Sequence, residues 1–270
     1  MKIIADNLQI TRSNLADALF HRNPDPFQAL VQDMEAAGAE AIDLNTGPLG
    51  RNAAQEMAFC VDVVQSVSDL PILIDTANPV AMRAGLEANR KVAVINGVSL
   101  EPQKLAEILP LAVQYDVDVI GYLLDGRSQM PSNQEDRMAI ALELFQRCLS
   151  AGLRTEQLII DPVVAPLIWQ DGLRRNRDLL EIVRRLPELL DFPVRTVAGL
   201  SNLTTGQGPR NLKRRIEQLY LSMLAAAGLS WVLLDIHHHD TVASVRICQM
   251  LLNDDIFAWN PTANDGASAP

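Results

Sequence analysis

The chain has 270 residues, of which 48% are hydrophobic and 21% charged, a size and composition that fit one soluble α/β domain. Its formal net charge of −10 argues against nucleic acid or an anionic membrane surface as the main partner. There is no basic-then-apolar segment at Met1, and no apolar run approaches the roughly 18 residues that cross a bilayer. We interpret Cys60, Cys148 and Cys248 as buried, inert thiols, so the expected location is a reducing cytoplasm.

Eight apolar runs of strand length follow one another along the chain, and nearly all of them stop at an Asp or Asn. Strands that are buried on both faces read as such continuous Val, Ile and Leu runs. In a closed parallel barrel the carboxyl ends of all strands emerge on one face, so we expect carboxylates and carboxamides around a single mouth, with almost no Lys, His or Cys. Such a ring suits a neutral, hydrogen-bond-rich molecule. The runs cover residues 2–5, 40–42, 71–74, 92–95, 119–124, 158–160, 197–200 and 231–234, and they are followed by Asp6, Asp43, Asp75, Asn96, Asp125, Asp161, Ser201 with Asn202, and Asp235.

Segments of helical period separate these runs, as in the βα repeats of a parallel sheet. Asn78 before Pro79 is typical of a helix start, and Gly38, Gly152 and Gly228 are typical of helix ends. We expect helices over residues 26–38, 53–68, 79–88, 102–115, 134–152, 177–190, 212–228 and 241–252.

Eight strands and eight helices predict an α/β fold of the (β/α)8 TIM barrel type over residues 1–259. A doubly wound open sheet is the alternative, but it rarely needs eight repeats and we find no glycine-rich dinucleotide loop. The small, polar tail at residues 260–270 is expected to be disordered.

Four segments at strand ends go beyond a generic barrel. With Ile95-Asn96 between them, their order and spacing resemble the pterin-binding methyltransferases, in particular methyltetrahydrofolate:corrinoid/iron–sulfur protein methyltransferase and the folate domain of cobalamin-dependent methionine synthase. The resemblance runs from about Met1 to Leu252. The segments are 43–48 (Asp-Leu-Asn-Thr-Gly-Pro), 74–79 (Ile-Asp-Thr-Ala-Asn-Pro), 160–162 (Ile-Asp-Pro) and 199–202 (Gly-Leu-Ser-Asn).

This resemblance implies a pterin-binding set. Asp75, Asn96 and Asp161 stand where the family's Asp, Asn and Asp hydrogen-bond the aminopyrimidinone edge of the pterin. That edge presents alternating donors and acceptors, so carboxylates can accept from its N–H groups while the Asn amide answers an acceptor.

The resemblance also implies a catalytic residue. Asn202 matches the family's mobile Asn, which contacts the pterin nitrogen that bears the methyl group. A tertiary amine is a poor leaving group unless its nitrogen gains positive character, so a group that stabilises the developing charge is catalytic. Asp43, Asn45 and Ser201 are expected to extend the network around that nitrogen.

Two departures from the family pattern lie near the mouth. The first strand of the family usually ends in a Gly-Glu-Arg-Ile-Asn-like motif, whereas residues 5–9 here read Ala-Asp-Asn-Leu-Gln. After Asn96 the family often has Ser, and here it is Gly97. Contacts from the first strand are therefore left out of the predicted site, and Asp6, Asp125 and Asp235 are interpreted as turn formers or helix caps.

Two further polar segments receive no catalytic role. The run His237-His238-His239 is interpreted as a surface loop, because three consecutive residues cannot all turn toward one metal; contact with substrate or partner at the mouth is the alternative. Residues 235–240 half-match the Asp-x-His-x-x-Gly signature of corrinoid-binding domains, but Asp240 replaces the glycine, so any corrinoid is expected on a separate protein. The basic stretch 210–215 is interpreted as a solvated helix start, or as a docking site for an acidic partner.

These observations predict a methyltransferase that moves a methyl group between methyltetrahydrofolate or tetrahydrofolate and the cobalt of a corrinoid carried by another protein. No metal of its own is expected, and a homodimer is expected because family members are homodimers. A dihydropteroate synthase is the first alternative, but its Asn-x-Thr-Pro-Asp-Ser-Phe-like and Ser-Arg-Lys-like motifs are replaced by Gln9-Ile10-Thr11 and Ser201-Asn202-Leu203. A non-catalytic folate-binding protein is the second. The direction of transfer and the identity of the corrinoid partner stay open.

Overall fold

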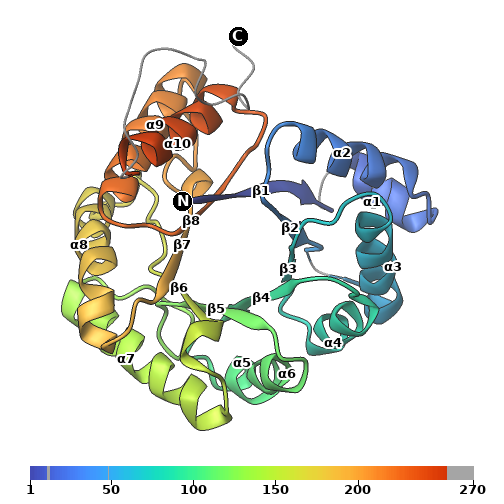
Figure 1. Cartoon of the computed structure of the whole chain (residues 1–270), viewed down its shortest axis with the longest axis horizontal. Helices are drawn as coiled ribbons and strands as arrows, with labels where there is room; N and C mark the ends of the chain where they lie inside the picture. The colour runs from blue at the N-terminus through green and yellow to red at the C-terminus, as the bar shows by residue number, and fades with distance from the viewer. Residues whose placement is uncertain (11–12, 48, 254–270) are drawn as a thin grey trace.

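Eight parallel strands close into a barrel in the computed structural model, which describes residues 1–10, 13–47 and 49–253 (Figure 1). Each strand pairs with the next one along the chain, and β8 pairs with β1. The prediction of a (β/α)8 barrel is confirmed, and the open sheet is wrong. The strands are β1 (Lys2–Gln9), β2 (Ala41–Asn45), β3 (Ile72–Asp75), β4 (Ala93–Val98), β5 (Asp118–Tyr122), β6 (Leu158–Asp161), β7 (Arg195–Gly199) and β8 (Trp231–Leu234).

Helices surround the barrel on its outside (Figure 1). All eight predicted helical segments are present, although the segment 102–115 is two short helices that meet at Ile108. None of the helices in the described part of the chain is long and apolar enough to span a membrane. The helices are α1 (Ser13–Phe20), α2 (Asp25–Ala36), α3 (Ala53–Gln65), α4 (Pro79–Ala88), α5 (Pro102–Glu107), α6 (Leu109–Gln114), α7 (Gln134–Ala151), α8 (Gly172–Leu190), α9 (Arg210–Ala226) and α10 (His239–Leu251), with 3₁₀ turns η1 (Thr155–Gln157) and η2 (Leu200–Asn202).

The predicted helix boundaries rest on capping groups that the structure contains. The Asn78 side-chain oxygen accepts hydrogen bonds from the N–H groups of Val80, at 2.9 Å, and Ala81, at 3.2 Å. It thereby satisfies two of the N–H groups that a helix start leaves without partners. Gly38, Gly152 and Gly228 follow helix ends with positive φ angles, as predicted. The predicted tail at residues 260–270 lies outside the described residues.

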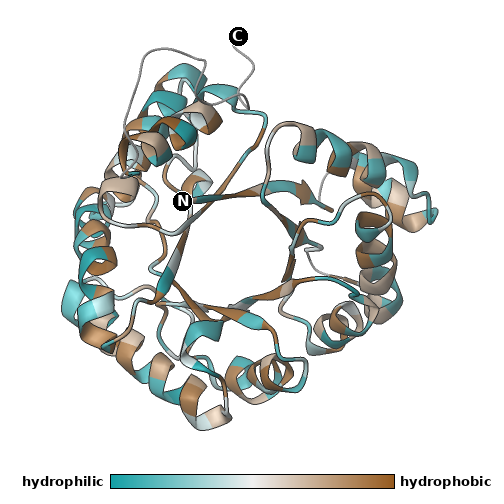
Figure 2. Ribbon diagram, viewed as in Figure 1, coloured by the Kyte–Doolittle hydropathy of each residue, from teal (hydrophilic) through white to brown (hydrophobic). Residues whose placement is uncertain are grey.

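Two apolar layers hold the barrel together. The larger layer fills the space between the strands and the inward faces of the helices, where Phe27, Leu144, Leu179 and Leu221 are fully buried. Figure 2 shows apolar residues along the strands and alternating apolar and polar residues on the helices. The second layer plugs the barrel interior and consists of Ile4, Ala41, Leu73, Val94, Ile120, Ile159 and Val197.

The three cysteines belong to the helices and are buried, as predicted. Burial raises the pKa of Cys60 and of Cys148 to about 12, which keeps both thiols protonated at neutral pH. Because the thiolate is the reactive form, these two groups are structural.

Candidate functional site

A polar ring lies directly above the apolar interior of the barrel, because alternate residues of a strand point to the same side. On β3, Leu73 belongs to the interior layer, and Asp75 is the next residue on that face. The step from Val94 to Asn96 repeats this relation on β4. The same step of two residues generates the whole ring, which consists of Asp6, Asp43, Asp75, Asn96, Tyr122 and Asp161.

One cavity of about 230 Å³ occupies the mouth of the barrel, at the carboxyl ends of the strands. All seven residues of the predicted site line it, and so do three polar residues outside that prediction: Asp6, Gln9 and Tyr122. Its lining contains no Lys, Arg or His within the described chain. The cavity is lined by Asp6, Gln9, Asp43, Asn45, Asp75, Asn96, Ile120, Tyr122, Asp161, Val197, Gly199, Ser201, Asn202 and Leu233.

Strand register brings Asn45, Asp75 and Asn96 side by side. Asn45 pairs with Asp75 across β2 and β3, and Asp75 pairs with Asn96 across β3 and β4. The Asn45 amide donates to Asp75 Oδ2 at 2.6 Å, while its Oδ1 accepts from the N–H of Gly47 at 2.9 Å. Asn45 therefore uses its oxygen to hold the following loop and one N–H to orient the carboxylate of Asp75.

A second hydrogen-bonded chain runs from Asp43 through Asn96 to Tyr122. The Asn96 amide nitrogen donates to Asp43 Oδ1 at 2.8 Å, and its oxygen accepts from the Tyr122 hydroxyl. These two contacts fix which way the Asn96 amide faces. The nitrogen keeps one further N–H that it can donate to a ligand.

Tyr122 was not among the predicted site residues, because the run 119–124 was expected to end at Asp125. The strand β5 ends three residues earlier, so Tyr122 stands at the mouth. Asp125 instead forms a turn, accepting from the N–H groups of Arg127, at 2.8 Å, and Gln129, at 2.9 Å. The interpretation of Asp125 as a turn former is confirmed. Counting two residues from the interior Ile120 is the sequence signal that would have found Tyr122.

Asp161 is held by the loop that follows its own strand. Its Oδ1 accepts from the N–H of Val163 at 2.7 Å, and Val163 has a φ of 61°. Beneath this loop the guanidinium group of Arg137, which is 1% exposed, donates to the carbonyl oxygens of Pro162, Val163 and Arg175. No described residue donates a hydrogen bond to Asp161 Oδ2, so one carboxylate oxygen can accept from a ligand.

The carboxyl groups at the mouth are easier to protonate than free carboxyl groups. Burial raises the pKa of Asp75 to about 6 and that of Asp161 to about 7. Burial, with repulsion from Asp75, raises the pKa of Asp43 well above its usual range. Burial also raises the pKa of Tyr122, which keeps its hydroxyl a donor. A ligand that donates N–H groups to these carboxylates stabilises their ionised forms, so its binding is linked to the release of protons.

Asn202 and Ser201 lie at the rim of the cavity, on η2 directly after β7. Both side chains are exposed, unlike Asp43 and Asn96, which are 2% and 6% exposed. Asn202 is therefore placed above the buried groups, on the side from which a second reactant can enter.

The interpretation of Asp6 as a turn former is wrong. The strand β1 continues through it to Gln9, and Asp6 lines the cavity. Asn7 permits the continuation because its buried amide has partners: it donates to Asp235 Oδ1 at 2.6 Å and accepts from the N–H of Ile236 at 2.9 Å. Asp235 and Ile236 lie more than 200 positions from Asn7 in the sequence, so these hydrogen bonds could not be predicted from the residues around it. Asp6 and Asn7, which suggested the end of a strand, therefore lie within β1.

Asp235 forms the turn that was predicted for it, because its Oδ1 also accepts from the N–H of His237 at 3.0 Å. His237 Nδ1 lies 3.4 Å from Asp33 Oδ2, and His238 Nε2 lies 3.4 Å from Asp235 Oδ2. His239 begins α10. The three side chains therefore do not converge, and across the described chain no group of three or more His, Cys, Asp or Glu is arranged to hold a metal ion.

Gly97 is explained by packing. A β-carbon at this position would lie 2.4 Å from the carbonyl oxygen of Ile120 on the neighbouring strand, which no side chain allows. The residue does not line the cavity. Its difference from the family's Ser is therefore a matter of how β4 meets β5.

The chain is thus a TIM barrel whose mouth holds a cavity lined by strand-end carboxylates and carboxamides. The chain belongs to the pterin-binding enzymes, since the model of that family, described as "Pterin binding enzyme", matches residues 7–235.

Individual relatives are distant. A methylcorrinoid:tetrahydrofolate methyltransferase from Eubacterium limosum is 23% identical over 236 residues, and the match covers 84% of each chain. The methionine synthase of Mycobacterium leprae is 24% identical over 212 residues, which are 74% of this chain and 17% of that protein.

Solved structures share the fold. The dihydropteroate synthase of Stenotrophomonas maltophilia superimposes with a TM-score of 0.69 at 18% identity, over 94% of both chains. The dihydropteroate synthase of Yersinia pestis in a sulfonamide complex gives a TM-score of 0.69 at 17% identity, over 93% of both chains. At these identities the likeness concerns the barrel and not the reaction.

Proposed function

We propose that the chain transfers a methyl group between a tetrahydrofolate bound in the barrel mouth and the cobalt of a corrinoid on a separate protein. The observation that supports this proposal most is the cavity itself: every residue expected to contact the pterin or its methylated nitrogen lines one space of about 230 Å³. The Eubacterium limosum relative, matched over 84% of its length, has a name that describes this chemistry.

In this proposal Asp75, Asn96 and Asp161 hold the aminopyrimidinone edge of the pterin. The open oxygen of Asp161 accepts from an N–H group of the ring, and Asp75, oriented by Asn45, accepts from another. Asn96 donates its remaining N–H to a ring acceptor, while Asp43 and the Tyr122 hydroxyl keep its amide from rotating. Each hydrogen bond that involves a carboxylate contributes about 1.5–3 kcal/mol.

Asn202 acts on the nitrogen that carries the methyl group. In the transfer to cobalt(I), the metal's electron pair forms the bond to the methyl carbon, and the carbon–nitrogen electron pair returns to nitrogen, which ends with a proton from solvent. A donor at this nitrogen stabilises the change and is worth about 2.7–4 kcal/mol when well placed. The exposed position of Asn202 leaves the methyl group open toward a partner. Asp43, Asn45 and Ser201 extend the polar surroundings of this nitrogen.

The reaction itself distinguishes the proposed activity from its alternatives. The protein is mixed with methyltetrahydrofolate and free cob(I)alamin in an anaerobic single turnover, and separately with a dihydropterin diphosphate and p-aminobenzoate. We expect methylcobalamin in the first mixture and no dihydropteroate in the second. Tight folate binding without methylcobalamin would indicate a non-catalytic folate-binding protein, and dihydropteroate would indicate a synthase.

The proposal includes a corrinoid protein as partner and a homodimer as the working assembly. The homodimer follows from the resemblance to the family. Light scattering on the purified chain is expected to give a mass of twice 29.7 kDa, and a mass equal to the single chain would contradict it.

A further inference from the structure

A second cavity, of about 410 Å³, adjoins the pterin cavity and shares Ser201 with it. Three cationic side chains line this second cavity: Arg210, Lys213 and Arg214, all from the first turns of α9. The function proposed above does not use them. They form a local concentration of positive charge in a chain whose net charge is −10.

In the described part of the chain, the protein's own carboxylates do not form ion pairs with these cations. Glu217, the acid in this cavity, accepts a hydrogen bond from the Thr204 hydroxyl and lies 3.9 Å from His238 Nδ1. Lys213 Nζ donates to the carbonyl oxygen of Gly206. Within the residues that the structure describes, no carboxylate lies within 4.0 Å of the guanidinium of Arg210 or Arg214.

A third cavity, on the opposite side of the mouth, has an acidic lining. It measures about 740 Å³ and shares Asn45 and Asp75 with the pterin cavity. Its lining includes Asp75 and Glu107 and, in the described chain, no Lys or Arg. An anionic group attached to the pterin would therefore be repelled on that side and attracted toward Arg210 and Arg214.

We propose that the cavity lined by Arg210, Lys213 and Arg214 binds the glutamate tail of the folate substrate and selects folates with more than one glutamate. The inference rests on the proposed function, because it requires a folate in the neighbouring cavity. Folates carry their glutamate at the end away from the pterin, and each added glutamate brings one more carboxylate. Guanidinium groups bind carboxylates in two-point hydrogen bonds, which suits Arg210 and Arg214.

The test is a binding measurement on the isolated protein, with methyltetrahydrofolate carrying one or three glutamates as the probes, at low and at high salt. For the unmodified chain we expect the triglutamate to bind about tenfold more tightly at low salt, with the difference shrinking as salt screens the charges. The double variant Arg210→Gln/Arg214→Gln should bind both forms within about twofold of each other. Arg215→Gln removes one positive charge from the same helix outside the cavity and should keep the preference, whereas the single variant Arg214→Gln removes one charge inside the cavity and should weaken it.

Equal binding of the two folates by the unmodified chain would overturn the inference, and would leave the basic stretch to an acidic protein partner. Loss of the preference in Arg215→Gln, to the same extent as in the double variant, would also overturn it, since a general field and not this cavity would be responsible. Absence of binding by either folate would instead overturn the proposed function. Melting curves of the variants show that they are folded before binding is measured.

Discussion

Each acidic side chain of the proposed pterin clamp is bound by the protein on one side and available on the other. Asp161 gives one oxygen to the N–H of Val163, and Asp75 gives one oxygen to the amide of Asn45. These bonds orient the carboxylates before a ligand arrives, which lowers the entropy lost on binding. They do not compensate fully for burial, because the pKa of each group is still raised.

Asp161→Asn should therefore weaken folate binding without weakening the fold. The Asn oxygen can still accept from the N–H of Val163, but the amide cannot replace a carboxylate toward a ring N–H. We expect the binding free energy to become less favourable by about 1.5–3 kcal/mol, which raises Kd roughly 10- to 150-fold. Titration calorimetry measures this change. Melting temperature at pH 7.5 should stay the same or rise, because a buried charge has been removed. Unchanged affinity in a folded variant would exclude Asp161 from the clamp.

The sequence was informative about single residues where a strand ends at a polar side chain. Asp43, Asp75, Asn96 and Asp161 meet at the mouth because the parity of each strand fixes the side on which its residues lie. Asp6 and Tyr122 could not be placed in the same way. The end of β1 depends on the contact between Asn7 and Asp235, and the end of β5 depends on where pairing with β6 stops.

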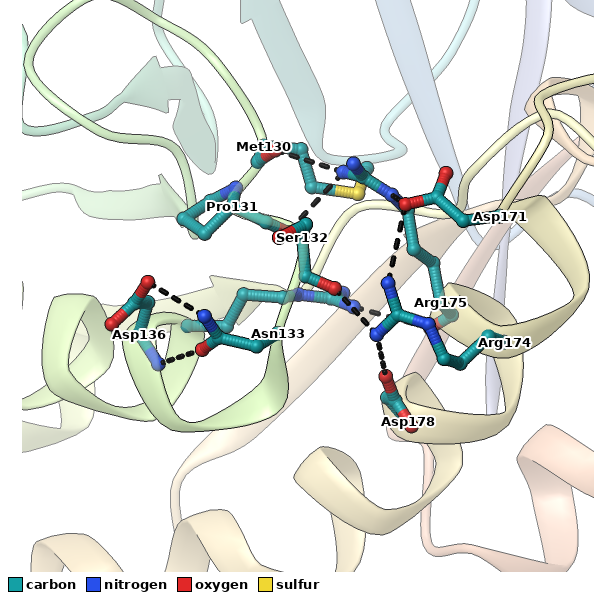
Figure 3. Close-up of polar contacts among 10 residues, drawn as sticks. Met130, Pro131, Ser132, Asn133, Asp136, Asp171, Arg174, Arg175 and Asp178 are labelled. Carbon is teal, nitrogen blue, oxygen red and sulfur yellow. Dashed lines mark hydrogen bonds and ion pairs between the residues drawn. The ribbon is translucent and has the colours of Figure 1, made fainter.

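At the scale of elements, the loop between β6 and α8 is held by a buried arginine of α7 and by two arginines at the start of α8. From below, Arg137 of α7 binds the carbonyl oxygens of Pro162 and Val163. From outside, Arg174 and Arg175 at the start of α8 reach across to the segment before α7, as Figure 3 shows: Arg174 donates to the carbonyl of Ser132 at 2.7 Å.

Three further contacts belong to this outer network. Arg175 donates to the carbonyl of Met130 at 2.8 Å, and its Nε lies 2.8 Å from Asp171 (Figure 3). Asn133 caps α7 by accepting from the N–H of Asp136 at 2.7 Å. The helices on either side of β6 are thereby connected to each other, and the loop that follows Asp161 lies between them.

Arg137→Met should be strongly destabilising and should also weaken folate binding. The variant leaves the carbonyl oxygens of Pro162 and Val163 without their donor, at about 1–3 kcal/mol each, so we expect a melting temperature lower by about 5–15 °C. Kd for methyltetrahydrofolate should rise because Asp161 is no longer held in place.

Arg174→Ala is the matched control for that experiment. Arg174 belongs to the same connection between α7 and α8, but its side chain is 46% exposed, and its ion pairs contribute about 0–1 kcal/mol. Its removal should leave Kd unchanged. Equal effects of the two variants on Kd would show that Arg137 supports the fold in general and not the position of Asp161.

Helices were predicted well where the chain carries caps and poorly where it does not. Asn78 and Gly152 mark their helix boundaries locally. The eight-residue α1 was not predicted, since so short a segment shows little period, and its Leu15 is buried only through tertiary packing. The expected helix 102–115 is divided because Pro110 cannot donate a backbone hydrogen bond. The helix α8 begins five residues before its predicted start at Arg177, among the arginines that bind the preceding loop.

At the scale of the whole molecule, the carboxyl groups of the mouth reduce the stability of the ligand-free protein as pH rises. A carboxyl whose folded pKa is raised binds a proton more tightly when folded. Its stabilising contribution is present below the unfolded pKa of about 3.9 and is lost as pH rises through the folded value. For Asp75 and Asp161 these folded values are about 6 and about 7.

We therefore expect the melting temperature of the ligand-free protein to fall between pH 5 and pH 8. Saturating methyltetrahydrofolate should raise it more at pH 8 than at pH 5, because the ligand stabilises the ionised carboxylates. Differential scanning calorimetry across this range measures both effects, and Asp161→Asn should reduce the dependence on pH. A ligand-induced rise that is larger at pH 5 would mean that the folate binds the protonated groups.

The closed barrel was predictable because eight repeats of strand and helix can pack in few ways. That the two cavities at Ser201 adjoin was not predictable. Arg210, Lys213 and Arg214 line a cavity that shares Ser201 with the mouth of the barrel, and His238, which directly precedes α10, lines the same cavity. That arrangement depends on how the loop after β7 folds back toward α9, a feature with no periodic signal in the sequence.

The proposed role of Asn202 in methyl transfer is tested by the transfer rate of Asn202→Ala, measured together with its folate affinity. In stopped-flow mixing with cob(I)alamin, the folate-bound unmodified protein should form methylcobalamin. Asn202→Ala should do so about 10²- to 10³-fold more slowly, while Gln207→Ala in the same loop is unchanged. Kd for methyltetrahydrofolate should move little in Asn202→Ala, because the clamp of Asp75, Asn96 and Asp161 is intact. Transfer at the unmodified rate by Asn202→Ala would contradict the catalytic role of Asn202. Absence of methylcobalamin from the folate-loaded unmodified protein would contradict the proposed methyl transfer.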